Sequence, residues 1–588
     1  MRFWFKKKQV SEVSFEEILL DVSNLPSFNQ GRMEGKRELP ITTRNVGLVA
    51  VVFVLITVVF FIRLFTLQVI EGAEFADKSE NNSLDRTVLI AERGVVYDRH
   101  NELIAWNEPD AKNVYTFPVR AYTDRRGLGQ LVGYVSYPLK DTRGFYFRTE
   151  YIGRNGVEAS YNTHLSGQNG QQLVEMDVHG EVITQHVVDT PKPGQPVVLS
   201  IDAALSEAMY DIIATSTVQA GFRSGAAAIM DVHTGEIIAM TSFPSYDPEV
   251  MADGDDVALI EQYNNDERFP FLNKLFAGVY TPGSVIKPFV AYAGLKEGVI
   301  TESTTMNSNG MLTIASRYSP GNPARFADWR VQGEMTVREA LAFSSNVFFY
   351  IVGGGLPEVA VPQAGLTQPF VGLGIAKLDE YFDLFGFGQT TGIDLANEQA
   401  GTVPNPEWKT AVFDEDWRLG NTYHTAIGQF GWQTTPLQML VAYGALATGG
   451  KLVTPQIEKG ATPEFTMINL DPYILNIVQE GMRMTVNFPR GTARSLERDD
   501  IAIAAKSGTA EIGAGNAYVN SWAAGYWPYD EPKYVFVLMM DQAPRSNALG
   551  ATTIMGDVME WMSVHTPEYL GLQKPAAVVV DDGAITIE

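Results

Sequence analysis

YTPGSVIKPFVAYAGL, residues 280–295, is the most informative segment of this sequence. Pro282 and Gly283 mark a break, and the almost wholly apolar stretch after them predicts a buried helix that begins near Ser284. Ser284 and Lys287 are three residues apart, so they share one face of that helix. Burial favours the neutral lysine amine, which can take the proton of a nearby hydroxyl. Taken alone, the pattern fits better a serine that caps a helix and a lysine that reaches solvent.

A second segment, AFSSNVFFY (342–350), also places polar side chains in an apolar run. Burying such groups is costly unless they are paired. The hydroxyl of Ser344 can relay a proton, and the amide of Asn346 can hold a substrate amide. By itself, the segment fits better a polar turn or cap between two core helices.

The third segment is IAIAAKSGTA (501–510), in which Lys506 emerges from a strand-like apolar run. Gly508 lets a substrate backbone lie close to the strand, and Thr509 offers a hydroxyl and a backbone N–H. An ordinary strand end that runs into a turn explains this segment alone. Together, however, S-x-x-K, S-x-N and K-[ST]-G in this order form the signature of penicillin-binding proteins and serine β-lactamases.

Further segments resemble class B penicillin-binding proteins over nearly the whole chain after residue 45. AERGVVYDR (91–99), GVEASYN (156–162) and LSG (165–167) resemble landmarks of the family's pedestal domain, and Asp231, TGE (234–236), Ala239, Met240, PSYDP (244–248), IGQ (427–429) and TPLQ (435–438) resemble those of its transpeptidase domain. The sequence departs from the pattern at Phe430, where a glycine is expected. The last motif is Lys-Ser-Gly, a permitted variant.

The resemblance implies a role for each motif residue. Ser284 attacks the penultimate D-Ala carbonyl of a stem peptide, Lys287 is the base, Ser344 passes the proton to the leaving D-Ala, Asn346 holds the peptide and Lys506 supports the network. Ser507, Gly508 and Thr509 form the substrate-binding segment, in which the two hydroxyls bind the terminal carboxylate. The backbone N–H groups of Ser284 and Thr509 form the oxyanion hole. An amine of a neighbouring stem then resolves the acyl-enzyme.

The implied function is a peptidoglycan D,D-transpeptidase that acts on stem peptides ending in D-Ala-D-Ala and binds β-lactams, with weak D,D-carboxypeptidase activity as a possible side reaction. The segments 328–350, 417–429 and 506–511 resemble the elongation type of the family more than the septal division type, which stays open. A non-enzymatic β-lactam receptor or scaffold is the alternative of another class. The segment 71–190 is too short for a glycan polymerase, so the resemblance implies a SEDS-family polymerase and wall-synthesis scaffold proteins as partners.

Composition excludes several other functions. The 588 residues include no cysteine, which rules out disulfides and thiolate chemistry, and the seven histidines show no metal-ligand spacing. No metal and no cofactor are expected. A net charge of −25 argues against a nucleic-acid partner. G-x-S-x-G and P-loop motifs are absent from the sequence.

Residues 46–62 are uncharged and mostly apolar, and the apolar character continues past Arg63 to residue 70. This length predicts one transmembrane helix rather than a buried core helix or a cleaved signal peptide. Residues 1–45 carry eight Lys/Arg and six Asp/Glu, which leaves −27 for the rest. The positive-inside rule therefore places the N-terminus in the cytoplasm and the remainder outside the cell membrane.

We expect an α/β multidomain chain, with its fold class defined by a single membrane helix, a mixed pedestal, and an antiparallel sheet packed by helices in the transpeptidase domain. The predicted boundaries are a cytoplasmic tail at 1–45, the membrane helix at 46–70, the pedestal and linker at 71–196, the transpeptidase domain at 197–570 and a C-terminal tail at 571–588. The hairpin 225–242 and the strands 500–508, 520–527 and 534–541 should build the sheet.

Overall fold

The computed structural model describes residues 42–75, 84–112, 114–142, 146–176, 182–315 and 321–573. Nearly all of the predicted cytoplasmic tail and most of the predicted C-terminal tail lie outside these residues. The chain divides into two compact units, one of residues 1–86 with 173–186 and the other of residues 87–172 with 187–588. The second unit holds all three motifs.

The first unit contains the predicted membrane helix. Helix α1 (Thr43–Phe65) continues into a π-helical turn, η3 (Thr66–Ile70), and together they are long and apolar enough to cross a membrane. None of the residues of α1 is buried, although most are large and hydrophobic. A core helix of a soluble domain would be buried, so the alternative of a core helix is wrong. Arg63 pairs with Glu71 at 3.7 Å.

The pedestal is built around a four-stranded sheet in the order β11-β2-β3-β4. The strands are β2 (Val96–Tyr97), β3 (Leu103–Glu108), β4 (Val119–Tyr122) and β11 (Val197–Val198). A three-stranded sheet pairs β1 (Leu84–Leu89), β9 (Gly170–Met176) and β10 (Val182–Asp189) in the order β1-β9-β10. The smaller elements are α3 (Gly129–Val132), β5 (Val135–Ser136), β6 (Leu139–Lys140), β7 (Tyr146–Arg148), β8 (Ile152–Gly153), α4 (Gly156–Ser160) and α5 (Asn162–Leu165).

A buried ion cluster joins two of the sequence landmarks of the pedestal. Arg93 lies in the first landmark, and its guanidinium bonds the carboxylate of Glu158 in the second at 2.5 Å. Arg120 reaches the other carboxylate oxygen at 2.7 Å. Burial raises the pKa of Glu158, but the two arginines outweigh it and hold that pKa below its ordinary value. The two landmark segments therefore meet at this buried ion cluster, which we call the lock between Arg93 and Glu158.

The second sheet has five antiparallel strands in the order β13-β12-β22-β21-β20. They are β12 (Ser224–Asp231), β13 (Ile237–Phe243), β20 (Ala504–Ile512), β21 (Tyr518–Trp527) and β22 (Tyr534–Pro544). The predicted hairpin and antiparallel sheet are confirmed. The third strand was predicted to end at Gly508, which is wrong: β20 runs through the Lys-Ser-Gly motif to Ile512, because its backbone keeps pairing with β21 as far as Tyr518.

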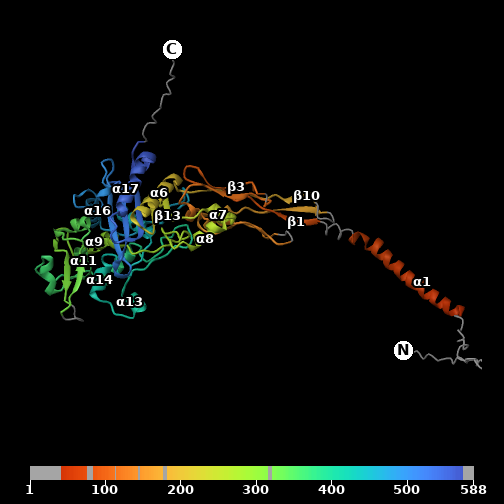
Figure 1. The fold of residues 1–588 in the computed structure, drawn as a ribbon, viewed down its shortest axis with the longest axis horizontal. Helices are drawn as coiled ribbons and strands as arrows, with labels where there is room; N and C mark the ends of the chain where they lie inside the picture. Colours follow the sequence, from red (N-terminus) through yellow and green to blue (C-terminus); the bar gives the residue numbers. More distant parts are fainter. Residues whose placement is uncertain are drawn as a thin grey trace, which may run out of the picture. The chain divides into compact units, whose positions relative to one another are not determined.

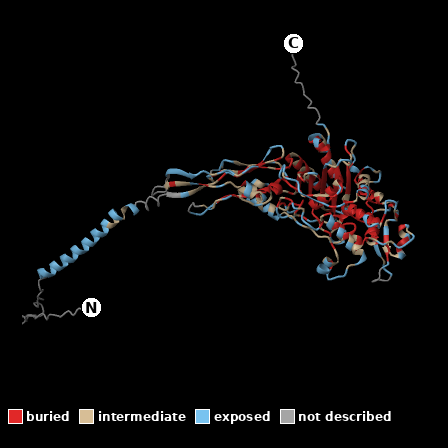
Figure 2. Cartoon of the chain, turned by 180° about the vertical axis from the view of Figure 1, so that it is seen from behind, coloured by how far each residue is buried: buried red, intermediate tan, exposed pale blue. Residues whose placement is uncertain are grey.

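Helices cover both faces of this sheet, and alternate strand residues feed the two cores. Ala227 and Ile229 of β12 pack in one core cluster with residues of α6 (Ala203–Ala220) and α17 (Ala551–His565). Both helices are labelled in Figure 1. Ala226 and Ala228 face the other way, toward α9 (Lys287–Lys296), α11 (Asn346–Gly354) and α15 (Pro436–Thr448). The buried residues of this part of the chain accordingly concentrate around the sheet (Figure 2).

The remaining elements of the larger unit are helices and short strands. They are α7 (Pro248–Asp253), α8 (Val257–Asn265), η4 (Gly283–Ile286), β14 (Met306–Ser308), β15 (Met311–Ile314), β16 (Ala324–Ala327), β17 (Gly333–Met335), α10 (Val337–Phe343), η5 (Glu358–Ala364), α12 (Gly374–Leu384), α13 (Pro406–Phe413), α14 (Leu419–Thr425), β18 (Lys451–Val453), β19 (Phe465–Met467), α16 (Pro472–Asn487), η6 (Arg494–Leu496), η7 (Ala514–Asn516) and η8 (Pro567–Leu570).

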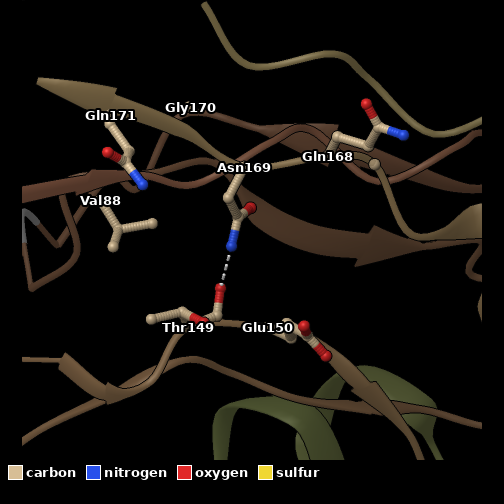
Figure 3. Close-up of a pocket in the computed structure, with 8 residues that line it drawn as sticks. Val88, Thr149, Glu150, Gln168, Asn169, Gly170 and Gln171 are labelled. Carbon is tan, nitrogen blue, oxygen red and sulfur yellow. Dashed lines mark hydrogen bonds between the residues drawn. The ribbon is translucent and has the colours of Figure 1, made fainter. Parts of the chain in front are cut away.

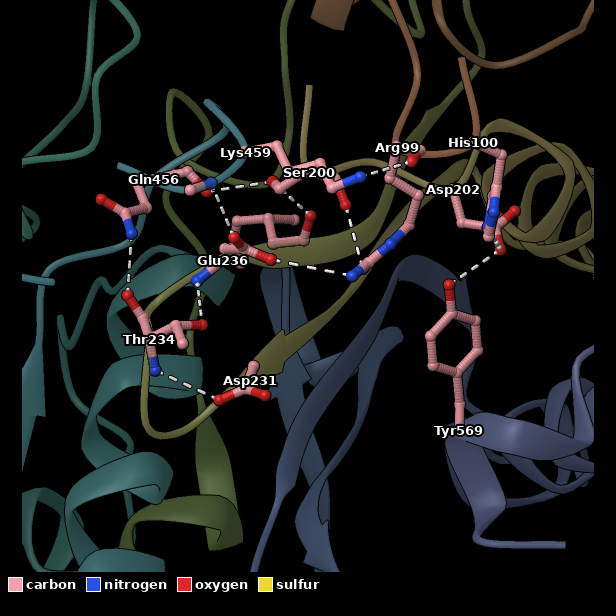
Figure 4. Close-up of polar contacts among 12 residues, drawn as sticks. Arg99, His100, Ser200, Asp202, Asp231, Thr234, Glu236, Gln456, Lys459 and Tyr569 are labelled. Carbon is pink, nitrogen blue, oxygen red and sulfur yellow. Dashed lines mark hydrogen bonds and ion pairs between the residues drawn. The ribbon is translucent and has the colours of Figure 1, made fainter. Parts of the chain in front are cut away.

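Polar contacts tie the pedestal sheet to the second sheet within the larger unit (Figure 4). Arg99, next to β2, donates to Ser200 O at 3.1 Å and pairs with Glu236 at 3.7 Å. Lys459 donates to the carbonyl of Arg99 at 2.8 Å. Because they join Arg99 to residues after position 197, these bonds hold the pedestal against the part that carries the five-stranded sheet.

Candidate active site

The first motif lies where the 3₁₀ turn η4 passes into α9. Ser284 is partly exposed within η4, and Lys287 begins α9 with a side chain that is 0% exposed. Neither η4 nor α9 is capped by a side chain, so Ser284 is not a capping serine. Lys287 does not reach solvent either. The structure thus excludes both parts of the ordinary explanation of this motif.

Close packing holds the first motif against β20. A Cβ on Gly508 would come within 2.9 Å of Val285 and 3.0 Å of Pro282 O, and a Cβ on Gly283 would come within 3.0 Å of Thr509 O. Both glycines are therefore required for the approach of η4 to the strand. The space that the sequence suggested for a substrate backbone at Gly508 is filled instead by the segment of Ser284.

Lys287 reaches the second motif. Its Nζ donates to Ser344 O at 2.8 Å and to Asn346 Oδ1 at 2.7 Å, and it lies 3.5 Å from Ser344 Oγ. Burial lowers the pKa of Lys287 to about 7, although the charge of Asp328 opposes that shift. A substantial fraction of this lysine is therefore neutral near neutral pH, which is the form that a general base needs.

Lys506 approaches the same hydroxyl from the sheet. Its Nζ donates to Ser344 Oγ at 2.8 Å and to Ser507 O at 3.0 Å, and its side chain is 0% exposed. Burial, together with the nearby Lys287, holds the pKa of Lys506 well below its ordinary value. Two amines thus converge on the Ser344 hydroxyl, which can pass a proton between them.

Asp328 holds the second motif in place. Its carboxylate accepts from Ser345 Oγ at 2.6 Å, from the backbone N–H of Asn346 at 3.0 Å and from Ser308 Oγ at 2.8 Å. Ser345 also caps α11 by accepting from Phe348 N at 3.3 Å. The expectation of a polar cap between helices therefore holds for Ser345, whereas Ser344 faces both lysines and Asn346 accepts from Lys287.

The third motif lies on β20, which is the edge strand of its sheet. Thr509 is exposed and Ser507 is half-buried, and the Ser507 hydroxyl donates to Thr492 Oγ1 at 2.6 Å. Backbone groups of alternate residues point to the same side of a strand, so those of Ser507, Thr509 and Glu511 face the free edge. An extended peptide could pair with this edge at Thr509.

Gln429 ends the free edge of β20. In the amide orientation that satisfies both partners, its side-chain nitrogen donates to Glu511 O at 3.2 Å and its oxygen accepts from Glu511 N at 3.1 Å. The preceding residue, Gly428, accepts from Gly283 N at 2.9 Å. One loop therefore connects the segment of Ser284 to the strand of Thr509.

The structure brings the predicted residues of all three motifs together in one place. Sequence reasoning missed the roles of Asp328, Thr492 and Gln429. In the sequence, Asp328 stood out only as the first residue of the segment 328–350. Thr492 and Gln429 act through bonds to residues 15 and 82 positions away. Gln429 stands in the IGQ segment, which carried the family resemblance but gave no sign of this bond, and Thr492 stands in none of the quoted segments.

A recess in the pedestal is a poorer candidate for an active site than the place where the three motifs meet. It has a volume of about 410 Å³ in the pedestal, and it is lined by Val88, Thr149, Glu150 and residues 167–171 (Figure 3). Asn169 spans it by donating to Thr149 O at 2.6 Å. The lining contains no nucleophile paired with a base. Among the described residues, no group of His, Asp and Glu could hold a metal ion.

Comparisons with known proteins agree with this geometry. A family model described as penicillin binding protein transpeptidase domain matches residues 225–560, and one described as penicillin-binding protein dimerisation domain matches residues 111–199. The chain is 29% identical over 517 residues to peptidoglycan D,D-transpeptidase MrdA of Escherichia coli K12, which covers 80% of this chain and 77% of that protein.

Two solved structures are also similar. One, titled "Structural coordination of polymerization and crosslinking by a peptidoglycan synthase complex", is 26% identical with a TM-score of 0.68, and the match covers 91% of this chain and 100% of that one. The other, a complex between penicillin-binding protein PBP2 and MreC from Helicobacter pylori, is 24% identical with a TM-score of 0.65, and covers 82% and 99%. The second likeness concerns the fold alone.

Proposed function

The chain belongs to the class B penicillin-binding proteins, and from this membership we propose that it is a membrane-anchored peptidoglycan D,D-transpeptidase that works through a serine acyl-enzyme. The assignment of residues rests on the meeting of Lys287 and Lys506 at the hydroxyl of Ser344, since Lys287 follows Ser284 by one helical turn. Two buried amines with lowered pKa values beside one hydroxyl suit proton transfer better than structural support.

Acylation begins with the neutral amine of Lys287, which takes the proton of the Ser284 hydroxyl. The serine oxygen attacks the carbonyl of the penultimate D-Ala of a stem peptide. The backbone N–H groups of Ser284 and Thr509 stabilise the resulting oxyanion, a role supported by the packing of Gly283 against Thr509. As the peptide C–N bond breaks, Ser344 delivers a proton to the leaving D-Ala nitrogen, with Lys506 as its neighbour.

Deacylation runs the same steps in reverse with a new amine. The amine of a neighbouring stem attacks the ester, its nitrogen loses a proton to the Lys287 and Ser344 network, and the Ser284 oxygen regains a proton as it leaves. During acylation the donor lies along the free edge of β20, where Ser507 and Thr509 bind the carboxylate of the terminal D-Ala until that residue leaves, and Asn346 holds the donor backbone. A β-lactam mimics the D-Ala-D-Ala end and stays attached to Ser284.

Labelling with a fluorescent penicillin tests the site. The purified full-length protein should acquire one covalent label, and mass spectrometry should locate it on Ser284. Ser284→Ala should abolish labelling and leave the thermal unfolding transition nearly unchanged, since this residue is partly exposed. Ser303→Ala, which removes an exposed hydroxyl outside the three motifs, is the control for the loss of a serine that keeps the nucleophile. A label on any other serine would overturn the assignment of Ser284.

We also propose an elongation role, with a SEDS-family glycan polymerase and wall-synthesis scaffold proteins as partners. The support is the likeness to a synthase complex for polymerization and crosslinking and to peptidoglycan D,D-transpeptidase MrdA. The distribution of charge around α1 supports a cytoplasmic N-terminus and an extracytoplasmic catalytic part. A reporter that is active only outside the cytoplasm, fused after residue 588, should be active; a stable but inactive fusion would reverse this topology.

A further inference from the structure

Two arginines beside the second and third motifs face each other without a carboxylate partner. Arg330 Nη2 donates to the carbonyl of Arg490 at 3.3 Å, and Arg490 Nη2 donates to Gln332 O at 3.1 Å. Both guanidiniums also approach Gln332 Oε1, at 3.2 Å from Arg330 and 3.5 Å from Arg490. Within the described ranges, no Asp or Glu oxygen lies within ion-pair distance of either guanidinium. Gln332 is only 4% exposed, so the pair is anchored rather than loosely placed.

The electrostatics of this pair are unusual for the chain. Burial and the charge of Arg490 both lower the pKa of Arg330, and the opposing Asp328 has its oxygens occupied by the second motif. Like charges held together are destabilising. A chain with a net charge of −25 has many carboxylates available to neutralise them. An anionic ligand that completes the pair explains why they stand together.

The pair is attached to the catalytic motifs on one side. Trp329 Nε1 and Gln332 Nε2 both donate to the carbonyl of Phe343, at 3.1 and 3.3 Å, and the next residue is Ser344. The Arg490 guanidinium lies 4.3 Å from the centre of the Phe343 ring. Two residues after Arg490, Thr492 accepts from the hydroxyl of Ser507. The pair thus borders the Ser344 side of the site.

We propose that Arg330 and Arg490 form an anion subsite that binds a carboxylate of the acceptor stem peptide. This inference rests on the proposed transpeptidase function. The donor occupies the edge of β20, and its carboxylate binds Ser507 and Thr509 only until it leaves with the terminal D-Ala. Ser344 serves the leaving nitrogen, and the entering nitrogen must take the same place, so groups beyond Ser344 meet the acceptor.

The chemistry of the subsite fits a carboxylate. Guanidinium groups bind carboxylates through two parallel, charge-assisted hydrogen bonds. The Arg330 guanidinium stacks 4.1 Å from the ring centre of Trp329, whose indole is 53% exposed and offers an apolar wall to the rest of the peptide. The arginines take no part in bond making. They hold the acceptor so that its amine reaches the ester of Ser284.

Partitioning of the acyl-enzyme tests the subsite. Full-length protein is acylated with a thioester donor, and the acceptor is a stem tetrapeptide with free carboxylates or the same peptide with its carboxylates amidated. The measured quantity is the ratio of cross-linked to hydrolysed donor. Amidation should lower this ratio about tenfold for the wild type, in keeping with the loss of a charge-assisted bond. Arg330→Gln and Arg490→Gln should lower the ratio for the free peptide to a similar extent and remove the discrimination.

Controls separate this inference from the proposed function and from misfolding. Arg126→Gln removes an exposed arginine of the pedestal that already pairs with Asp211 of α6. This variant should leave the ratio unchanged. Arg490→Lys keeps a charge and should restore part of the discrimination. Penicillin acylation of Ser284 must proceed in every variant within about threefold of the wild type, which shows that the site is folded.

Two results would overturn the subsite. One is a ratio that does not respond to amidation or to either arginine substitution. The other is slower acylation with an unchanged ratio, which would assign the arginines to the donor. Failure of the wild type to acylate at all would instead contradict the proposed function.

Discussion

Ser344 adopts a left-handed backbone conformation, with φ 56°, between α10 and α11. Residues with a side chain rarely adopt this conformation, and such strain persists where surrounding contacts impose it. Here the contacts are with the two lysines, because the turn directs both the carbonyl and the hydroxyl of Ser344 toward Lys287. Without that turn, the hydroxyl could not face Lys287 and Lys506 together.

The lowered pKa of Lys287 predicts how acylation depends on pH. The neutral amine is the base, and its population rises as pH increases through about 7. The rate of penicillin acylation should therefore rise between about pH 6 and 8 and then level off. In Lys287→Arg, the rate of penicillin acylation should fall by about a hundredfold or more, because the guanidinium stays protonated and cannot act as a base.

Acylation reactions that are quenched at set times across this pH range measure both quantities: the pH profile of the wild-type rate and the rate of Lys287→Arg. The exposed Lys377, which pairs with Glu297 and Glu380, provides the control: Lys377→Arg should keep the wild-type profile. A flat profile, or near wild-type acylation by Lys287→Arg, would remove Lys287 from the role of base.

Strand β20 is the element on which the site depends. It carries Lys506 toward the second motif, presents Ser507 and Thr509 at its free edge, and receives η4 at Gly508. The apolar run ends at Ala505, and the prediction from the hydrophobic pattern therefore ended the strand at Gly508, before its actual end at Ile512. Pairing with β21 extends it, and that information lies in another part of the sequence.

The bond between Gln429 and Glu511 should control the spacing between the two oxyanion donors. In Gln429→Glu, the carboxylate still accepts from Glu511 N–H, but it cannot donate to Glu511 O. Two acceptors then face each other, which costs about 1–3 kcal/mol. Acylation should fall about tenfold at pH 8, and its rate relative to the wild type should recover near pH 5, where a protonated carboxyl can donate.

Gln363→Glu is a matched control for this substitution. Gln363 accepts from Thr313 N at 2.9 Å and donates to Thr313 O at 2.8 Å, so the same chemical change is made on the strand β15. It should lower the melting temperature without a pH-dependent loss of acylation. Equal acylation defects in the two variants would show that Gln429 acts only through general stability.

At the scale of the whole molecule, local patterns were predictable and long-range contacts were not. The apolar periodicity around Lys287 and the hairpin of β12 and β13 depend on neighbouring residues, and the sequence predicted both. Arg93 and Glu158 are 65 positions apart. The sequence shows the two landmark segments that contain them but not the ion pair that joins them. The boundary between the pedestal at 71–196 and the transpeptidase domain at 197–570 stays a prediction, and β11 at Val197–Val198 pairs with the pedestal strand β2.

Depletion of the protein in its own host tests the elongation role. A wall that is no longer extended along the cell length while septa still form must widen under turgor, so depleted cells should become rounded and their aspect ratio should fall. Wild-type protein should restore the rod shape, whereas Ser284→Ala should not, because the cross-link and not the presence of the protein carries the load. Rescue by Ser284→Ala would favour a scaffold. Long filaments with blocked septa would contradict the elongation role, and penicillin labelling of Ser284 would still support a transpeptidase, now at the septum. Cell width and length measured during depletion therefore decide the cellular role independently of the chemistry, which no residue of the active site specifies.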